Sequence, residues 1–245
     1  MLDYVILGII QGIFEWIPIS SQGIVAIASQ FLIKEVHPLE MALFLHLGTL
    51  LAVLIYFRKE WIEVFRFKNI SLLRFLVVSA AISGIVGFAL YILIKNIAIG
   101  NTLLVITGFG LLLTAYFHKA KRMPGINLNK LAVITGILQG LAVIPGLSRS
   151  GATIFGLSLG KLNPEEILKI SYMMSAPAVL AMTVFLFFKN PVLISEGWPA
   201  LIFSFLAGFL TLDFLLKVAN KIDFFKFALI FALFCFLGAG LELLF

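Results

Sequence analysis

The chain has 245 residues, of which 62% are hydrophobic and only 12% are charged. Soluble domains carry about twice that share of charged residues, so the composition excludes a soluble globular protein and indicates a polytopic, all-α membrane protein. The net charge of +6 comes from basic residues between apolar stretches, which favours cytoplasmic loops over nucleic-acid binding. We therefore expect a multi-pass protein of the plasma membrane.

Six stretches are apolar throughout and long enough to cross a hydrocarbon core of about 30 Å, which takes roughly 20 helical residues. They lie at about 39–57, 72–94, 99–117, 166–188, 199–217 and 226–244. The sequence predicts a transmembrane helix at each of these places.

Two further apolar stretches, at about 2–33 and 129–160, are interrupted near the middle. The interruptions read PISS from Pro18 and PGLS from Pro145. Half-helices of about 11–16 residues would be roughly 16–24 Å long, too short to cross the membrane. We expect each stretch to form a re-entrant helical hairpin that enters the membrane and turns back.

The two interrupted stretches resemble each other at a separation of about 128 residues. Gly8, Gln11, Gly12, Ser20 and Gly23 of the first correspond to Gly136, Gln139, Gly140, Ser148 and Gly151 of the second. A hairpin followed by three spans therefore occurs twice in one membrane domain of residues 1–245, over about 1–120 and 121–245. Because three spans are an odd number, the second copy is predicted to be inverted, so that the hairpins meet near the midplane.

The basic residues support this topology. Of the eighteen Lys and Arg residues, fourteen fall in the connections 58–74, 118–130, 161–169 and 217–226, which the topology places on one side. Three fall on the other side, and the remaining one is Arg149. By the positive-inside rule, the basic side is cytoplasmic and both termini are outside.

The polar residues at the interruptions predict an anion-binding site. Serines stand where each hairpin enters its second helix, and they are well suited to cap the free N–H groups there. These serines are Ser20, Ser21, Ser148 and Ser150. The positive ends of two helices would then face one cavity, and Arg149 presents a planar fork that fits phosphate or diphosphate oxygens. The alternative for Arg149 is an ion pair with Glu15 that only ties the hairpins together.

Other polar residues near the interruptions are open to more than one interpretation. Glu15 lies one turn after Gln11 and could exchange protons, orient a water or help to hold a divalent cation. Gln11 and its counterpart Gln139 could donate to phosphate or form hydrogen bonds between helices. Thr153 could contact a ligand or pack between helices. For His46, inside the first span, packing or gating is favoured over catalysis.

Two segments, QGIFEWIPISSQG at Gln11–Gly23 and PGLSRSGAT at Pro145–Thr153, resemble the signature segments of the undecaprenyl-diphosphate phosphatase, or bacitracin-resistance, family. Length, hydropathy and the duplicated order of hairpin and spans resemble this family over nearly the whole chain. The resemblance implies an integral membrane enzyme that hydrolyses a polyprenyl diphosphate to the monophosphate and phosphate. Such an enzyme recycles the lipid carrier of cell-wall sugars.

The resemblance also implies roles for single residues. Arg149 would bind and stabilise the phosphoryl groups, in a cradle completed by Ser148, Ser150 and Thr153. Glu15 corresponds to the second acid of the family's Glu-x-x-x-Glu element, and Ser21 to its nucleophilic or phosphate-binding serine. A Mg²⁺ or Ca²⁺ ion with Glu15 as a ligand is implied by the resemblance alone.

Two positions depart from the usual pattern of the family. Gln11 stands in place of the first acid, which removes one metal ligand or base. Ile24 stands where the family usually has a histidine after Ser-Ser-x-Gly, so neither motif contains an acid–base histidine. This weakens a Ser/His nucleophilic mechanism and favours water, activated by Glu15, over Ser21 as the nucleophile.

The leading hypothesis is thus a polyprenyl-diphosphate phosphatase whose partners are the lipid substrate and the bilayer, with a homodimer left open. A flippase or transporter for a polyprenyl phosphate is the alternative, because inverted repeats with broken helices are the usual architecture of alternating access. An inactive relative that only binds lipid phosphate is a third reading. The phosphatase and flippase hypotheses share one structural requirement, which is that Glu15 and Arg149 meet.

Overall fold

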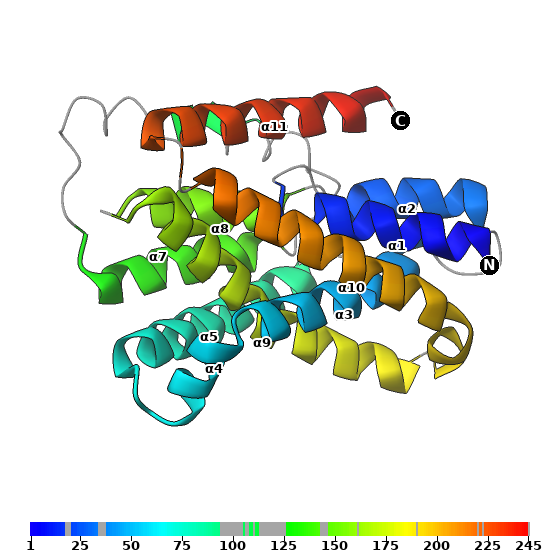
Figure 1. Ribbon diagram of the computed structural model, residues 1–245, viewed down its shortest axis with the longest axis horizontal. Coiled ribbons are helices and arrows are strands. Elements are labelled where there is room, and N and C mark those ends of the chain that lie inside the picture. Colours follow the sequence, from blue (N-terminus) through cyan, green and yellow to red (C-terminus); the bar gives the residue numbers. More distant parts are fainter. Residues whose placement is uncertain are drawn as a thin grey trace.

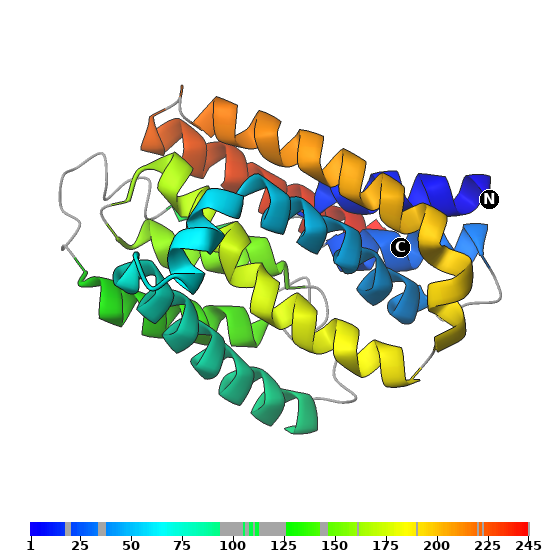
Figure 2. The same cartoon turned by 60° about the horizontal axis from the view of Figure 1, so that its bottom comes forward.

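The computed structural model describes residues 1–17, 21–33, 38–93, 105, 108–109, 111–112, 126–142, 147–160, 162–189, 191–219, 221 and 223–244. The helices are α1 (Leu2–Phe14), α2 (Ser21–Leu32), α3 (Pro38–Tyr56), α4 (Arg58–Phe65), α5 (Ile70–Leu93), α7 (Leu128–Leu141), α8 (Arg149–Ser158), α9 (Pro164–Lys189), α10 (Pro191–Ala219) and α11 (Phe224–Leu244). The long helices run roughly along one axis, and both termini lie toward the same end of it (Figures 1 and 2). The described part of the chain is therefore an elongated helical bundle.

Helices α3, α5, α9, α10 and α11 occupy five of the six predicted spans. The remaining predicted span, at about 99–117, lies mostly outside the described residues. Within the described part of the chain, Ile70–Leu90 and Gly197–Ala219 are long and apolar enough to cross a membrane. Glu40–Tyr56 and Arg58–Phe65, which are bent by 78° at Phe57, form a third candidate if they count as one span. The fold is that of a helical membrane protein.

Both interrupted stretches are helical on each side of the break, as the sequence predicts. The helices that flank the breaks have 13 and 12 residues in the first copy and 14 and 10 residues in the second. At 1.5 Å per residue each is about 15–21 Å long, too short to cross a core of about 30 Å. In each copy the two helices contact each other: α1 packs against α2, and α7 packs against α8.

The most extensive helix contacts join the two halves of the chain. α1 packs along α10, and α7 packs along α5. With the offset of about 128 residues, α1, α3 and α5 correspond to α7, α9 and α10. Each interrupted stretch therefore lies against a long helix of the other half. The α1–α10 contact is the counterpart of the α7–α5 contact when each helix is replaced by its equivalent in the other copy.

The duplicated glycines allow these contacts to be close. They are Gly8 and Gly12 on α1 and Gly136 and Gly140 on α7. A Cβ atom at Gly12 would lie 2.5 Å from the backbone nitrogen of Gly208, and one at Gly136 would lie 2.8 Å from the carbonyl oxygen of Ser79. Both distances are shorter than van der Waals contact, about 3.5–4.0 Å between carbon atoms. Small residues four apart are a common way for membrane helices to approach closely.

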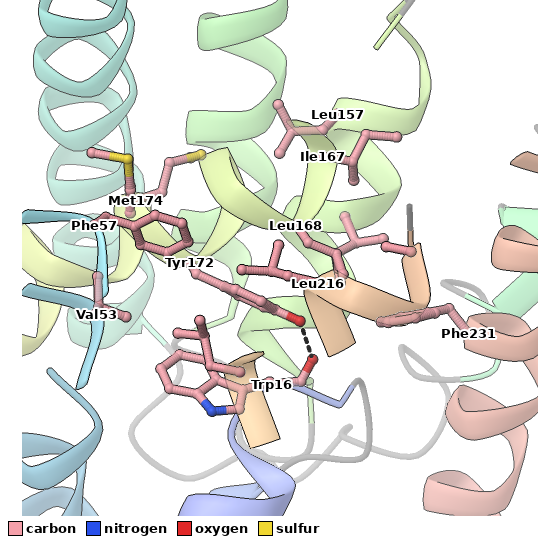
Figure 3. Close-up of a cluster of buried hydrophobic side chains, with 14 of the residues drawn as sticks. Trp16, Val53, Phe57, Leu157, Ile167, Leu168, Tyr172, Met174, Leu216 and Phe231 are labelled. Atoms are coloured by element: carbon pink, nitrogen blue, oxygen red, sulfur yellow. Dashed lines mark hydrogen bonds between the residues drawn. The ribbon is translucent and has the colours of Figure 1, made fainter. Parts of the chain in front are cut away.

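A buried hydrophobic cluster holds the first break against the second half of the chain (Figure 3). Trp16 is 1% exposed, and its ring centroid lies 4.9 Å from that of Tyr172 on α9. The indole Nε1 of Trp16 donates to the carbonyl oxygen of Gly208 on α10 at 2.8 Å. These contacts fix the backbone next to Glu15, the residue on which the site is built.

Candidate active site

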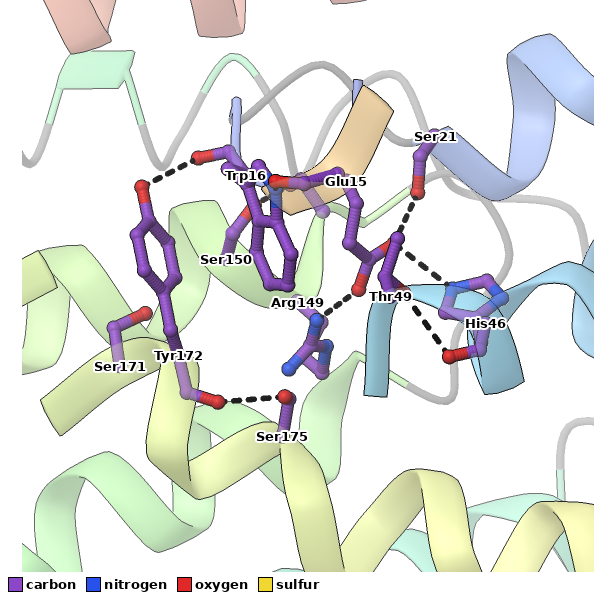
Figure 4. A network of polar contacts seen from close by, with 12 residues as sticks. Glu15, Trp16, Ser21, His46, Thr49, Arg149, Ser150, Ser171, Tyr172 and Ser175 are labelled. Atoms are coloured by element: carbon purple, nitrogen blue, oxygen red, sulfur yellow. Dashed lines mark hydrogen bonds and ion pairs between the residues drawn. The ribbon is translucent and has the colours of Figure 1, made fainter. Parts of the chain in front are cut away.

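Glu15 is the centre of a buried polar network at the end of α1 (Figure 4). Gln11 Nε2 and Ser21 Oγ each donate to Glu15 Oε2 at 2.8 Å. His46 Nε2 lies 3.1 Å from the same oxygen. Arg149, the first residue of α8, forms an ion pair with Glu15 Oε1. The network thus joins residues of α1, α2, α3 and α8, and it brings the two breaks together.

Side chains of the second half satisfy backbone carbonyls that the first break frees. Tyr172 Oη donates to the carbonyl oxygen of Trp16 at 3.1 Å, and Ser150 Oγ donates to that of Ile17 at 3.1 Å. Non-helical backbone at membrane depth is tolerated only where it is buried in protein or lines a wet cavity. The turn after Glu15 is therefore held in place by α8 and α9.

The start of α8 has the cap that the sequence predicts. Ser148 is its N-cap residue, and its Oγ accepts from the backbone N–H of Gly151 at 3.2 Å. Ser148 Oγ also lies 3.1 Å from Ser150 Oγ. Because α8 begins here, its positive end faces the same place as the Arg149 guanidinium, and both attract an anion.

A pocket of about 40 Å³ opens beside this network. Its polar walls are Glu15, Ser21, Gln22, His46, Ser148, Arg149 and Ser150. Arg149 Nη1 is buried and has no hydrogen-bond partner among the described residues. A buried donor without a partner costs free energy, so a ligand oxygen that accepted from Nη1 would remove that cost.

The structure separates the candidate residues into two groups. Gln11, Glu15, Ser21, Ser148, Arg149 and Ser150 belong to the network or line the pocket. Gln139 lies elsewhere: its Nε2 donates to Ser83 Oγ on α5 at 3.2 Å, which is the bond between helices named as its alternative. Thr153 Oγ1 lies 2.6 Å from Ser171 Oγ on α9 and also bonds backbone carbonyls, so it packs between helices. Ser20 lies outside the described residues.

His46 is a site residue that sequence reasoning did not select. It lies on the unbroken helix α3, outside both motifs, and its side chain is 12% exposed onto the pocket. The available signal was its chemistry, because an ionisable residue within a membrane span is functional by default.

The described residues do not form a cage for a divalent cation. Among the described residues, no group of three His, Cys, Asp or Glu side chains could hold a metal ion. Among the residues that the structure describes, Glu15 is the only carboxylate that lines the pocket, and Gln11, Ser21, His46 and Arg149 already engage its oxygens. The Mg²⁺ or Ca²⁺ ion stays a prediction from the resemblance, and we derive no step through it.

The chain is similar to a known family over nearly its whole length. A family model described as bacitracin resistance protein BacA matches residues 4–239. An undecaprenyl-diphosphatase of Methanococcoides burtonii is 33% identical, with 93% of this chain and 94% of the relative aligned. An undecaprenyl-diphosphatase of Sulfurisphaera tokodaii is 34% identical, with 90% of each chain aligned. One of Treponema denticola is 32% identical, with 98% of this chain and 96% of the relative aligned. The chain therefore belongs to the bacitracin resistance protein BacA family.

Proposed function

We propose that this chain is an integral membrane phosphatase that hydrolyses undecaprenyl diphosphate to undecaprenyl monophosphate and phosphate. Its relatives across nearly the whole chain are named for this activity. The observation that carries the proposal is the pocket in which Arg149, whose buried Nη1 has no hydrogen-bond partner in the described part of the chain, faces Glu15 and Ser21. A polyprenyl-phosphate flippase is not favoured, because the relatives are named as phosphatases.

The pocket is suited to the terminal phosphoryl group of the diphosphate. One water needs about 10–15 Å³ of cavity volume, so about 40 Å³ admits a few waters or one phosphoryl group. The guanidinium of Arg149 and the positive end of α8 would balance the charge of that group, and they would stabilise the charge that develops on it during transfer. The polyprenyl tail would then extend from the pocket among the membrane helices.

Glu15 is positioned to accept the proton of the nucleophile. Ser21 Oγ donates to Glu15 Oε2 at 2.8 Å, which is within reach for a base and its nucleophile. The pocket also has room for a water beside the same carboxylate. In either route a new P–O bond forms to the nucleophile, the bridging P–O bond breaks, and undecaprenyl monophosphate leaves. Through Ser21 a phosphoserine forms first, and water then releases phosphate from it.

The membrane topology follows from the repeat. We place six spans and two re-entrant hairpins in an inverted repeat in the plasma membrane, with both termini outside. The exchange of partners in the α1–α10 and α7–α5 contacts supports the repeat. Access from the outer face would follow, because the first hairpin opens outward in this topology.

The test is phosphate release from undecaprenyl diphosphate by the purified protein in detergent, alongside Ser21→Ala. We expect release by the wild type. A phosphoserine trapped in the wild type and absent from Ser21→Ala would identify the Ser21 route. Absence of release, together with translocation of labelled polyprenyl phosphate in liposomes, would overturn the phosphatase in favour of the flippase.

A further inference from the structure

Both ring nitrogens of His46 face oxygen atoms. Nδ1 lies 2.6 Å from the carbonyl oxygen of Ala42, one turn earlier on α3, and Nε2 lies 3.1 Å from Glu15 Oε2. The two contacts fix the ring between its own helix and the carboxylate, and Figure 4 shows the contact with Glu15. The ring also lines the pocket, next to Ser21 and Arg149.

These contacts determine how many protons the His46–Glu15 pair holds. A carbonyl oxygen only accepts hydrogen bonds, so Nδ1 carries a hydrogen and donates it to Ala42. A second lone pair at Nε2 would repel the carboxylate at 3.1 Å, so one further proton lies between Nε2 and Oε2. The pair therefore holds one transferable proton beside the pocket, as imidazolium and carboxylate or as imidazole and carboxylic acid.

The other partners of Glu15 hold its carboxylate in place. Gln11 and Ser21 also donate to Oε2, and Arg149 pairs with Oε1. Donors therefore reach both oxygens, and hydrogen bonds to a carboxylate are among the stronger ones in proteins. Glu15 of α1, His46 of α3 and Arg149 of α8 thus lie together, and the Tyr172 hydroxyl of α9 is nearby.

We propose that His46 is the acid–base partner of Glu15, and hence a catalytic residue of the diphosphatase reaction; this inference rests on the proposed function. When the nucleophile attacks, its proton passes to Glu15 Oε2. His46 gives its Nε2 proton to the bridging oxygen as the bond to phosphorus breaks. The proton on Glu15 then returns to His46 Nε2 across the same contact, so the pair ends in its starting state.

The position of Ile24 agrees with this role. Ile24 lies three residues after Ser21 on α2, on the same face of the helix. A histidine at this position would approach Ser21 from α2. His46 approaches the Glu15 carboxylate from α3, and α2 packs against α3. The imidazole that the motif lacks is thus supplied by a neighbouring helix.

The experiment measures phosphate release from undecaprenyl diphosphate by wild type, His46→Ala and His46→Gln, with thermal unfolding in detergent as the check on folding. We expect kcat to fall about 10²-fold in both variants with little change in KM, the usual size for loss of a general acid–base group. Added imidazole should restore part of the activity of His46→Ala but not of His46→Gln, whose side chain fills the space. Ile24→His should raise the activity of His46→Gln.

The outcomes separate this inference from the proposed function. If the wild type releases no phosphate, the proposed function fails. If the wild type is active and folded His46→Gln keeps its kcat within about threefold, His46 only fills space and the inference is overturned, while the phosphatase stands. If His46→Ala does not fold, the kcat of His46→Gln and its response to Ile24→His decide whether His46 is the acid–base group.

Discussion

The two breaks come from similar sequences, yet they contribute opposite chemical groups. The first supplies a carboxylate and a hydroxyl, Glu15 and Ser21, and its freed carbonyls accept from side chains of the second half. The second supplies a guanidinium and a helix N-terminus capped by its own Ser148. Similar sequences thus place a carboxylate beside one break and a guanidinium beside the other.

The paired glutamines show how one substitution changes a neighbour. Gln11 donates to Glu15, which lies four residues later on α1. At the same spacing after Gln139 the sequence has Val143, which cannot accept, and Gln139 donates to Ser83 instead. Equivalent residues therefore serve the site in one copy and helix packing in the other.

The largest effect should come from Arg149. Arg149→Ala removes the guanidinium that would hold the phosphoryl group, and we expect kcat/KM for undecaprenyl diphosphate to fall on the order of 10³-fold. Arg149→Lys should restore little, because an ammonium lacks the planar fork. Arg66→Ala, at an exposed arginine of the α4 end, is the matched control and should be unchanged. Equal activity of Arg149→Ala and wild type would refute the anion-binding role of the second break.

A smaller effect, confined to chemistry, should come from Glu15. Glu15→Gln keeps the shape of the side chain and removes the base, so we expect kcat to fall about 10²-fold with KM little changed. The contrast with Arg149→Ala is the informative measurement, because that variant should also weaken substrate binding. If both variants change KM alike, the two breaks do not divide binding and proton transfer between them.

The packing between the halves should contribute to stability rather than to chemistry. Gly12→Val places a branched side chain against α10, and we expect it to lower the free energy of unfolding by about 1–3 kcal/mol. Gly84→Ala on α5 is the control, because a Cβ there meets nothing within 4 Å, and it should not destabilise the protein. Thermal unfolding in detergent measures both. A neutral Gly12→Val would show that the α1–α10 contact is looser than described.

The two glutamines give a finer comparison. Gln11→Ala should lower kcat several-fold because it removes a hydrogen bond to Glu15, whereas Gln139→Ala should leave kcat unchanged and cost about 1 kcal/mol of stability. Phosphate release and thermal unfolding on the two variants decide this. A larger loss of activity in Gln139→Ala than in Gln11→Ala would indicate that Gln139 belongs to the phosphate site.

The smallest expected effect concerns divalent cations. EDTA should not change the unfolding temperature of the substrate-free protein, because the described residues form no cation cage. Any loss of phosphate release in EDTA would then be assigned to an ion that arrives with the diphosphate. A lowered unfolding temperature would instead reveal a resident ion and contradict this prediction.

Much of the site could be predicted because polar groups in a membrane span must find partners. The breaks, the cap at Ser148 and the meeting of Glu15 with Arg149 all follow from that constraint. The repeat did not mark His46, because α3 is unbroken and the residue 128 positions later is Met174, so its ionisable ring inside a span was the available signal. The side chain of Thr153 points to Ser171, and that of Gln139 points to Ser83. Only the packed structure shows that these residues are close.

The crossed packing of the halves has a consequence for biosynthesis. Chains emerge from the ribosome N-terminus first, so α7 finds α5 already made, whereas α1 has no α10 to pack on until most of the chain has been translated. Until α8 and α9 have been made, Glu15 lacks Arg149, and the backbone at Trp16 and Ile17 lacks its donors Ser150 and Tyr172. The first interrupted stretch is therefore made long before the helices that it packs against, and its packing is completed only after α10 has been translated.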